Sequence, residues 1–493
     1  MSHAFRRSFC TAAPAMALVA WCAASPARAA EHWISLTTPH FEMYTTNGAK
    51  QGTEALAVFE QVRSFFLKIS PTNKAADARL RIIAFKSEKE FSPYRPNDGA
   101  FAYYQRSRQR DYIVMEDIRA EHYPTAIHEY THLIVENAGL KLPVWLNEGL
   151  ADLYSSLEPK GRGAMVGRPL AGHVQVLGAF GWLDLALLTG VTPESPYYNE
   201  RNKMSIFYAQ SWLLTHMLAL SREYGPKFHQ FVLAVASGQS TEQAFASVYD
   251  RKLEEVGGDL RHYFRQNTVR ASIFDIELPK ADLDPEVREL TEFESSLALA
   301  DLLASHKATA AEARRRLELL AEDQPGSPEV DESLGYLAWE EGNKPAARTH
   351  FAQAEQKGST NPEMLYQYAM LLASTGGSRD EVIRALSKSI NLKPGFDEAR
   401  LALAMQLMDA KRYGSALSTL SEMRNVKPDQ AFSVFSALAF CSLQLKSAKN
   451  ARIWEIKALP YATSASEREQ AATFLRYLDI LENTVAAVPN GSQ

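Results

Sequence analysis

The chain has 493 residues, and its 58 Asp and Glu outnumber its 53 Lys and Arg, which gives a formal net charge of −5. The sequence contains no basic stripe with interleaved aromatic residues, so nucleic acid is excluded as the expected partner. The length predicts two or three domains.

The first 29 residues have the pattern of a secretory signal peptide. Arg6 and Arg7 give a positive start, residues 12–24 are apolar, and Ala27-Arg28-Ala29 offers small residues for cleavage. That apolar stretch is too short to span a membrane, and no later run approaches the necessary length. We therefore expect an exported protein, periplasmic or secreted, with no transmembrane segment and a mature chain that begins at Ala30.

Loss of this segment would leave 50 basic against 58 acidic side chains, a net charge of −8. It would also leave Cys441 as the one remaining cysteine, so the mature chain cannot form an internal disulfide. Because Cys441 lies in an apolar helical stretch, we expect a buried, inert thiol.

Residues 31 to about 118 mix strand and helix patterns. Strand-like alternation covers residues 32–45 and a short apolar run covers residues 80–85, with helical periodicity over residues 52–67 between them. Residues 101–104 and 112–115 flank a turn that carries three arginines and predict a hairpin. These elements indicate a small twisted sheet, with the arginine turn as a solvated tip.

The segment His128-Glu129-Tyr130-Thr131-His132 follows, on a helix expected from about Pro124 to a stop near Gly139. Two histidines four residues apart lie on one helix face, where both imidazoles can reach a single zinc ion. Glu129 is then placed to take a proton from zinc-bound water.

A catalytic zinc site needs a third protein ligand, which we expect from a second helix that begins at Pro143. Glu148 lies in the first turns of that helix and is the predicted third ligand. Asp152, four residues later on the same face, would accept the free ring N–H of a ligand histidine and fix its tautomer. The alternative is an amphipathic helical hairpin whose His and Glu side chains are simply solvated.

The His-Glu-x-x-His helix followed by Trp-Leu-Asn-Glu-Gly-Leu-Ala (residues 145–151) resembles the gluzincin metallopeptidases. The third zinc ligand of that family is the Glu of an Asn-Glu pair, and the resemblance is closest to the peptidase-MA-like domains of bacterial envelope proteins. The gap from His132 to Glu148 is shorter than in the zinc aminopeptidases, and no Gly-Ala-Met-Glu-Asn segment is present. The resemblance therefore favours an endopeptidase that binds one Zn²⁺ and a protein or peptide substrate.

The resemblance also implies two further features of the site. A downstream Tyr or His often stabilises the oxyanion in gluzincins, and Tyr208 is the candidate here, against the alternative of a packed helix tyrosine. The strand that borders the cleft pairs with substrate backbone, so residues 100–104 and 112–115 are candidates, with a structural role as the alternative. His216, by contrast, is expected on a helix surface.

The rest of the chain predicts two helical regions separated by a linker. Apolar stripes between residues 204 and 266 indicate a helical subdomain, and Pro279–Pro285 marks a linker, taken as residues 279–292. Beyond it, Pro328 and Pro362 lie 34 residues apart, as do Pro394 and Pro428, which is the period of a tetratricopeptide (TPR) repeat. We expect about five repeats, a capping helix at about 466–484 and a frayed tail at 485–493.

The predicted fold is thus an α+β metallopeptidase domain (residues 30–278) followed by an all-α TPR-like solenoid (residues 293–484). The predicted function is a zinc endopeptidase of the cell envelope, whose repeats select a protein partner. The alternative is a non-catalytic envelope scaffold in which the repeats bind proteins and the zinc site is structural or vestigial. Glu129 favours the enzyme, because a structural zinc site has no use for a carboxylate beside its first ligand.

Overall fold

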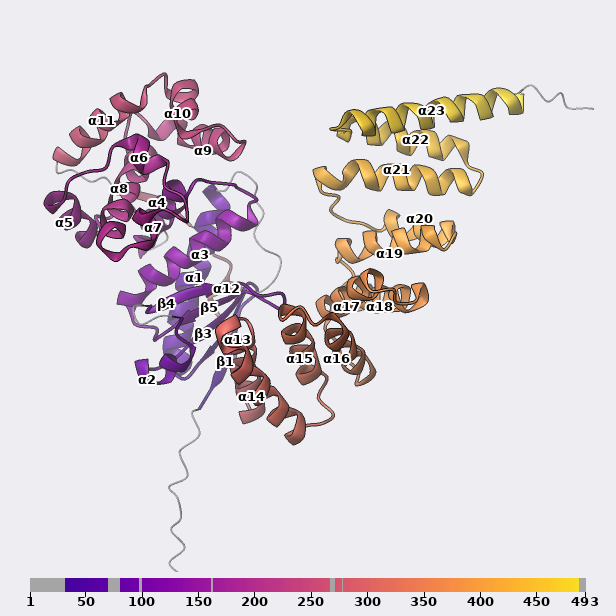
Figure 1. Ribbon diagram of the computed structural model, residues 1–493, viewed down its shortest axis with the longest axis horizontal. Coiled ribbons are helices and arrows are strands. Elements are labelled where there is room, and N and C mark those ends of the chain that lie inside the picture. Colours follow the sequence, from indigo (N-terminus) through magenta and orange to yellow (C-terminus); the bar gives the residue numbers. More distant parts are fainter. Residues whose placement is uncertain are drawn as a thin grey trace, which may run out of the picture.

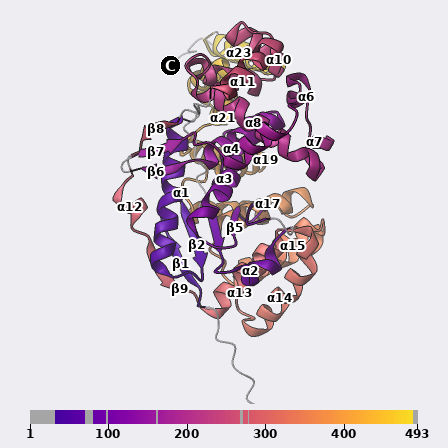
Figure 2. The same cartoon turned by 90° about the vertical axis from the view of Figure 1, so that its left-hand side faces the viewer.

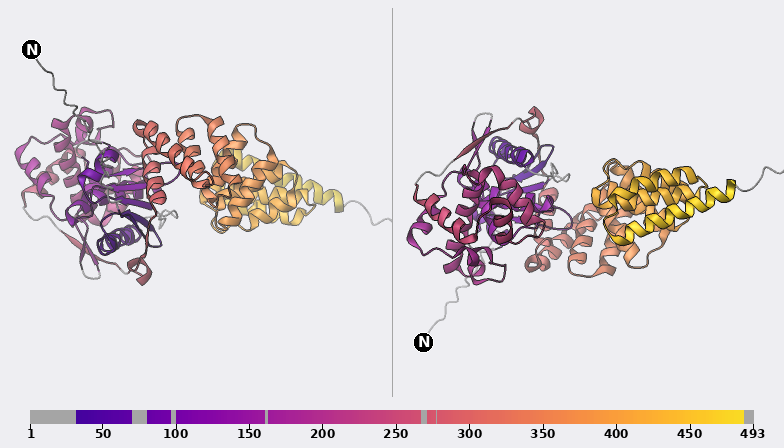
Figure 3. Two further views of the ribbon diagram at one scale, coloured as in Figure 1. Left: turned by 90° about the horizontal axis from the view of Figure 1, so that it is seen from below. Right: turned by 90° about the horizontal axis from the view of Figure 1, so that it is seen from above.

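The computed structural model describes residues 32–69, 80–96, 100–160, 163–266, 271–276 and 278–486, so the predicted signal peptide and most of the predicted tail lie outside the described residues. Two parts are visible: a mixed α/β part, and an arm of paired helices that extends from it (Figures 1 and 3). Within the described ranges, every helix is too short or too polar to cross a membrane.

The α/β part is built on a six-stranded mixed sheet in the order β4-β5-β3-β2-β1-β9. Its two parallel pairs are β2 with β3 and β3 with β5, and the remaining pairs are antiparallel. The strands are β1 (Ile34–Thr37), β2 (Phe41–Thr45), β3 (Leu80–Ala84), β4 (Ala102–Gln105), β5 (Tyr112–Met115) and β9 (Glu286–Glu289). The predicted continuous strand over residues 32–45 is in fact a hairpin, because Pro39 lies in a turn closed by Thr38 N–H donating to the Phe41 carbonyl at 2.9 Å.

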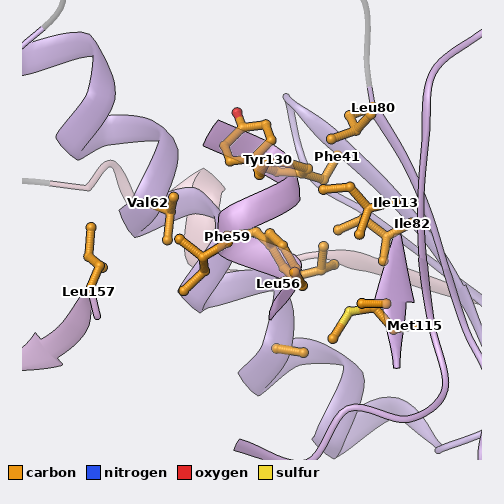
Figure 4. Packing of buried hydrophobic residues seen from close by; sticks show 14 of the residues in the cluster. Phe41, Leu56, Phe59, Val62, Leu80, Ile82, Ile113, Met115, Tyr130 and Leu157 are labelled. Atoms are coloured by element: carbon orange, nitrogen blue, oxygen red, sulfur yellow. The ribbon is translucent and has the colours of Figure 1, made fainter. Parts of the chain in front are cut away.

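Two helices, α1 (Ala49–Ile69) and α3 (Tyr123–Asn137), cover one face of this sheet. Phe41 of β2, Phe59 of α1 and Tyr130 of α3 meet there, with ring centroids 5.7–6.5 Å apart (Figure 4). All five residues of β3 are buried, because Leu80, Ile82 and Ala84 face this layer while Ile83 faces the opposite one. Helix α3, which carries the His-Glu-x-x-His motif, is therefore fixed against a packed core.

The opposite face of the sheet is covered by α2 (Glu88–Phe91) and α13 (Glu292–Ala304). Ala298 and Leu302 of α13 pack with Trp33, Tyr44 and Val114. Helix α13 thus belongs to the core of the α/β part as well as to the first helix pair of the arm.

The predicted linker at residues 279–292 is corrected by this arrangement. It forms the short helix α12 (Lys280–Leu283) and the edge strand β9, in which Glu289 opposes Ile34 of β1. Every side chain of β9 is exposed, so the segment has the polar composition of a linker while its backbone is held in the sheet. The arginine turn between β4 and β5 is not a free tip either: Arg108 pairs with Glu340 at 3.1 Å and lies over the Trp339 ring.

A helical subdomain completes the α/β part around α4 (Val144–Ser155) and α8 (Arg201–Leu220). Gly149 of α4 touches α8, since an added Cβ would lie 2.1 Å from Thr215 Oγ1 and 2.5 Å from the Ser211 carbonyl oxygen. The surrounding helices are α5 (Ala171–Ala179), α6 (Leu185–Thr189), α7 (Pro196–Asn199), α9 (Phe228–Ala236), α10 (Thr241–Ala244) and α11 (Leu253–Arg265). A small antiparallel sheet flanks them, formed by β6 (Glu158–Lys160), β7 (Gly163–Val166) and β8 (Ser272–Asp275).

The arm consists of antiparallel helix pairs stacked in chain order, followed by one long helix (Figure 1). The pairs are α13 with α14 (Ala310–Asp323), α15 (Pro328–Glu340) with α16 (Lys344–Gln356), α17 (Pro362–Ser374) with α18 (Arg379–Leu392), α19 (Asp397–Asp409) with α20 (Tyr413–Ser421), and α21 (Pro428–Gln444) with α22 (Ala448–Ala458). Helix α23 (Ala465–Ala486) closes the array. The predicted five repeats and capping helix are confirmed, and Gly335 and Phe351 contact each other as repeat positions should. Cys441 is buried in the array, as expected.

Candidate metal centre

The predicted ligands on α3 and α4 come together at the crossing of these two helices. His128 and His132 lie one turn apart on α3, with their Nε2 atoms 3.2 Å from each other. Glu148 Oε2 of α4 lies 3.4 Å from His128 Nε2 and 3.6 Å from His132 Nε2. Three donors from two helices therefore face one point.

These separations fit a zinc ion. Tetrahedral zinc bonds of about 2.0–2.1 Å place neighbouring donors roughly 3.3–3.5 Å apart, and the three distances here are 3.2, 3.4 and 3.6 Å. The Glu148 side chain is only 5% exposed, whereas the His128 and His132 rings keep 17% and 21% of their surface. The carboxylate of the donor set is therefore buried, and part of each histidine ring reaches solvent.

Asp152 orients the first histidine, as its position on α4 predicts. Its Oδ1 lies 2.9 Å from His128 Nδ1, which leaves His128 Nε2 directed at the ligand cluster. Its Oδ2 lies 2.8 Å from Nε2 of His173 on α5, a residue that belongs to neither sequence motif. Burial alone would raise the pKa of Asp152, but the hydrogen bonds with His128 and His173 outweigh it and hold the pKa at about 2.

Glu129 lies where the sheet borders the centre. Its Oε2 accepts a hydrogen bond of 3.3 Å from the backbone N–H of Tyr104 in β4. Among the described strands, β4 lies at the edge of the sheet and pairs with β5 alone, whereas β5 is paired on both sides with β3 and β4. Of the two candidate strands for substrate pairing, residues 112–115 are therefore excluded and β4 remains.

A tyrosine pair lies beside Glu148. Tyr198 of α7 donates its hydroxyl to Glu148 Oε1 at 2.9 Å, so Oε2 is the oxygen left to face the histidines. Tyr208 of α8, the residue predicted from the sequence, stacks on Tyr198 with ring centroids 6.2 Å apart. Burial raises the pKa of Tyr198 to about 12, with the Glu148 charge adding to it, and the same two causes raise the pKa of Tyr208. Tyr198, which sequence reasoning missed, makes the direct contact.

His216 is not the surface residue that the sequence predicted. It is fully buried in α8, with Nε2 3.0 Å from the Gly167 carbonyl oxygen and Nδ1 2.9 Å from the Tyr263 hydroxyl. Burial lowers its pKa, so the ring is neutral and structural.

No protein-family model and no curated protein matches this chain. Solved structures of small repeat proteins are similar to part of it. YrrB, described as a TPR protein with an unusual peptide-binding site, is 17% identical over 36% of this chain and 90% of its own, with a TM-score of 0.31. MamA is 16% identical over 34% and 92%, with a TM-score of 0.29, and the pilF protein of Pseudomonas aeruginosa is 16% identical over 39% and 94%, with a TM-score of 0.28. Likeness at this level carries no inference about function, and the TPR-like character of the arm rests on its own helix pairs.

Proposed function

We propose that the chain is a zinc-dependent peptidase, and specifically an endopeptidase, that acts in the cell envelope. The observation that carries this proposal is the set of three donors, His128 Nε2, His132 Nε2 and Glu148 Oε2, at mutual distances of 3.2–3.6 Å. Two imidazoles and one carboxylate with an open side are the donor set of catalytic rather than structural zinc sites.

Each residue around the donors has a defined task in this proposal. Bound zinc would supply the polarisation of the scissile carbonyl and a lowered pKa for its water. Glu129 takes the proton of that water and later delivers it to the leaving amine. Asp152 fixes the tautomer of His128, and Tyr198 fixes the carboxylate of Glu148. Tyr208 is the candidate donor to the oxyanion.

The edge strand β4 gives the proposal a binding mode for the substrate. An extended peptide can add to its free side, next to the strand residue Tyr104 whose N–H already reaches Glu129. Such binding relies on backbone hydrogen bonds and needs no free peptide terminus, which agrees with an endopeptidase.

The test is a metal analysis of the purified protein paired with cleavage of a casein-type substrate, with and without a chelator. The proposal expects bound zinc and cleavage that the chelator abolishes and added zinc restores. Cleavage that survives complete removal of the metal would contradict it.

The second candidate is a non-catalytic envelope scaffold, and the five helix pairs of the arm favour it. Stacked helix pairs form an extended concave surface of the kind that other proteins use to bind peptides or partners. A fully zinc-loaded protein that cleaves no unstructured substrate, yet retains a binding partner through residues 293–484, would establish this candidate instead.

A further inference from the structure

We propose a second divalent-cation site, formed by His40, Glu60 and Asp282. Each of these residues offers one ligand atom, and the three atoms all lie within 4.8 Å of one another. His40 lies in the turn before β2, Glu60 in α1 and Asp282 in α12, so the cluster joins three separate segments. This site is independent of the peptidase proposal.

The charge balance of the cluster calls for a cation. Glu60 is 1% exposed and Asp282 is 7% exposed, and within the described residues neither forms an ion pair with a lysine or arginine. Among the residues that the structure describes, the Glu60 carboxylate has one partner, His40, whose Nδ1 lies 2.8 Å from Oε2. Even a protonated His40 would leave one negative charge in a buried place, which is a costly arrangement unless a cation is bound.

The second observation is an unpartnered buried oxygen. Glu60 Oε1 is buried and has no hydrogen-bond partner in the described part of the chain, although a buried carboxylate oxygen is almost always paired. An ordinary His40–Glu60 ion pair explains the 2.8 Å contact. It does not explain why Glu60 Oε1 lacks a partner among the described residues, nor why a second carboxylate, that of Asp282, is buried beside Glu60.

The donor types select the class of ion. One imidazole nitrogen with two carboxylate oxygens suits Zn²⁺ or Mn²⁺, whereas Ca²⁺ and Mg²⁺ prefer oxygen ligands alone. Bonds of about 2.1 Å need donors roughly 3–4 Å apart, a spacing that three atoms within 4.8 Å of one another can adopt.

The ion would have a structural consequence. Helix α12 lies beside α1 and leads into β9, and from there into the arm (Figure 2). A cation held by His40, Glu60 and Asp282 would fasten α12 to the core of the α/β part. Its removal would loosen the segment that joins the two parts.

The experiment uses the full mature chain with the first centre disabled by His128→Ala and His132→Ala. The protein is stripped with a chelator, titrated with ZnCl₂ or MnCl₂, dialysed, and analysed for metal and thermal midpoint. We expect about one bound ion per chain and a midpoint that rises with metal. Addition of His40→Ala and Asp282→Asn should reduce the bound metal at least tenfold and abolish the rise in midpoint.

Two controls keep the result interpretable. His32→Ala with Asp284→Asn removes the same residue types from exposed neighbouring positions and should leave the metal content unchanged. His40→Ala with Asp282→Asn in an otherwise intact chain should lose one ion and keep the one at the first centre, which separates this proposal from the peptidase proposal. If the His128→Ala, His132→Ala chain remains folded and binds neither metal, or binds them equally well without His40 and Asp282, the second site does not exist.

Discussion

At the scale of single residues, the candidate centre depends on side chains that orient the ligands. Asp152 contacts His128 with one oxygen and His173 with the other, so its carboxylate is fixed from two sides. Tyr198 fixes Glu148 in the same way. Two of the three candidate ligands, His128 and Glu148, are thus each oriented by a neighbouring side chain.

Replacement of Asp152 by Asn is expected to weaken zinc binding at the first centre about 10- to 100-fold while the protein stays folded. The amide is neutral and has one acceptor oxygen in place of the two that contact His128 and His173, so it fixes the His128 tautomer less strongly. Competition with a chromophoric chelator measures the change, with the His40→Ala, Asp282→Asn background removing any second ion. Asp429→Asn, at an exposed position in the arm, is the control. Unchanged affinity would show that Asp152 does not support the ligand.

Substitution of Tyr198 and of Tyr208 is expected to affect different properties, zinc binding in the first case and turnover in the second. Tyr198→Phe removes the hydrogen bond to Glu148 Oε1 and is expected to weaken zinc binding. Tyr208→Phe should retain zinc and lower kcat by about 10²-fold, the usual effect of losing one oxyanion donor. Competition with a chelator measures the zinc affinity of both variants, and steady-state kinetics at saturating zinc measure their kcat. If Tyr208→Phe has the same kcat as the parent, Tyr208 contributes only to packing and does not stabilise the oxyanion.

Cys441 should be inert in the folded protein. It is fully buried in α21, and burial raises the pKa of its thiol to about 11, so the reactive thiolate is scarce at neutral pH. In the mature chain, which lacks Cys10 and Cys22, a thiol reagent at pH 8 is expected to label the protein only after denaturant is added. Rapid labelling of the native protein would show that the arm opens around α21.

At the scale of secondary structure, the sequence predicted the elements whose signals are local. The apolar periodicity of the sequence predicted helices α3 and α4. The 34-residue interval between prolines such as Pro328 and Pro362 predicted the helix pairs of the arm. Strand β9 could not be predicted, because its exposed side chains carry no alternation and only its backbone pairs with β1. Tyr198 and His173 were missed for a similar reason: they reach the centre from α7 and α5, through contacts distant in sequence.

The close crossing of α4 and α8 should tolerate no side chain at Gly149. An added Cβ would meet Thr215 Oγ1 and the Ser211 carbonyl, so Gly149→Ala is expected to lower the free energy of unfolding by about 1–3 kcal/mol. Gly258→Ala, in the exposed middle of α11, meets no neighbouring atom and should be stabilising by up to about 1 kcal/mol. Denaturant titration compares the two variants. Equal stabilities would contradict the packing of α4 on α8.

At the scale of the whole molecule, the sequence predicted a metallopeptidase domain that ends at residue 278 and is separated from the repeats by a linker. The position of β9 and α13 changes that expectation, because both belong to the core of the α/β part. The β4–β5 turn adds to the junction, with Gln109 donating to Asp301 of α13 at 3.3 Å and Arg108 pairing with Glu340. The arm therefore packs directly against the sheet and is not joined to it by a flexible linker alone.

Two truncations test this junction. A chain that ends at Leu278 should be poorly soluble or unstable, because it lacks α13 and so exposes the apolar side chains of Trp33, Tyr44 and Val114 to solvent. A chain that ends after α14, at Asp323, should fold and bind zinc at the first centre. Circular dichroism and metal analysis of both fragments measure the difference. A stable, zinc-loaded fragment that ends at Leu278 would restore the simple division into two independent parts.

The most direct test of the central claim compares the parent chain with Glu129→Gln, both loaded with zinc and both assayed for cleavage of an unstructured peptide. Glutamine cannot accept the proton of the attacking water, but it leaves the three ligands in place. We predict equal zinc content and equal thermal midpoints, with a loss of about 10²-fold or more in cleavage rate. Cleavage by Glu129→Gln at the parental rate would contradict the assignment of Glu129 as the general base, and with it the proposed peptidase mechanism.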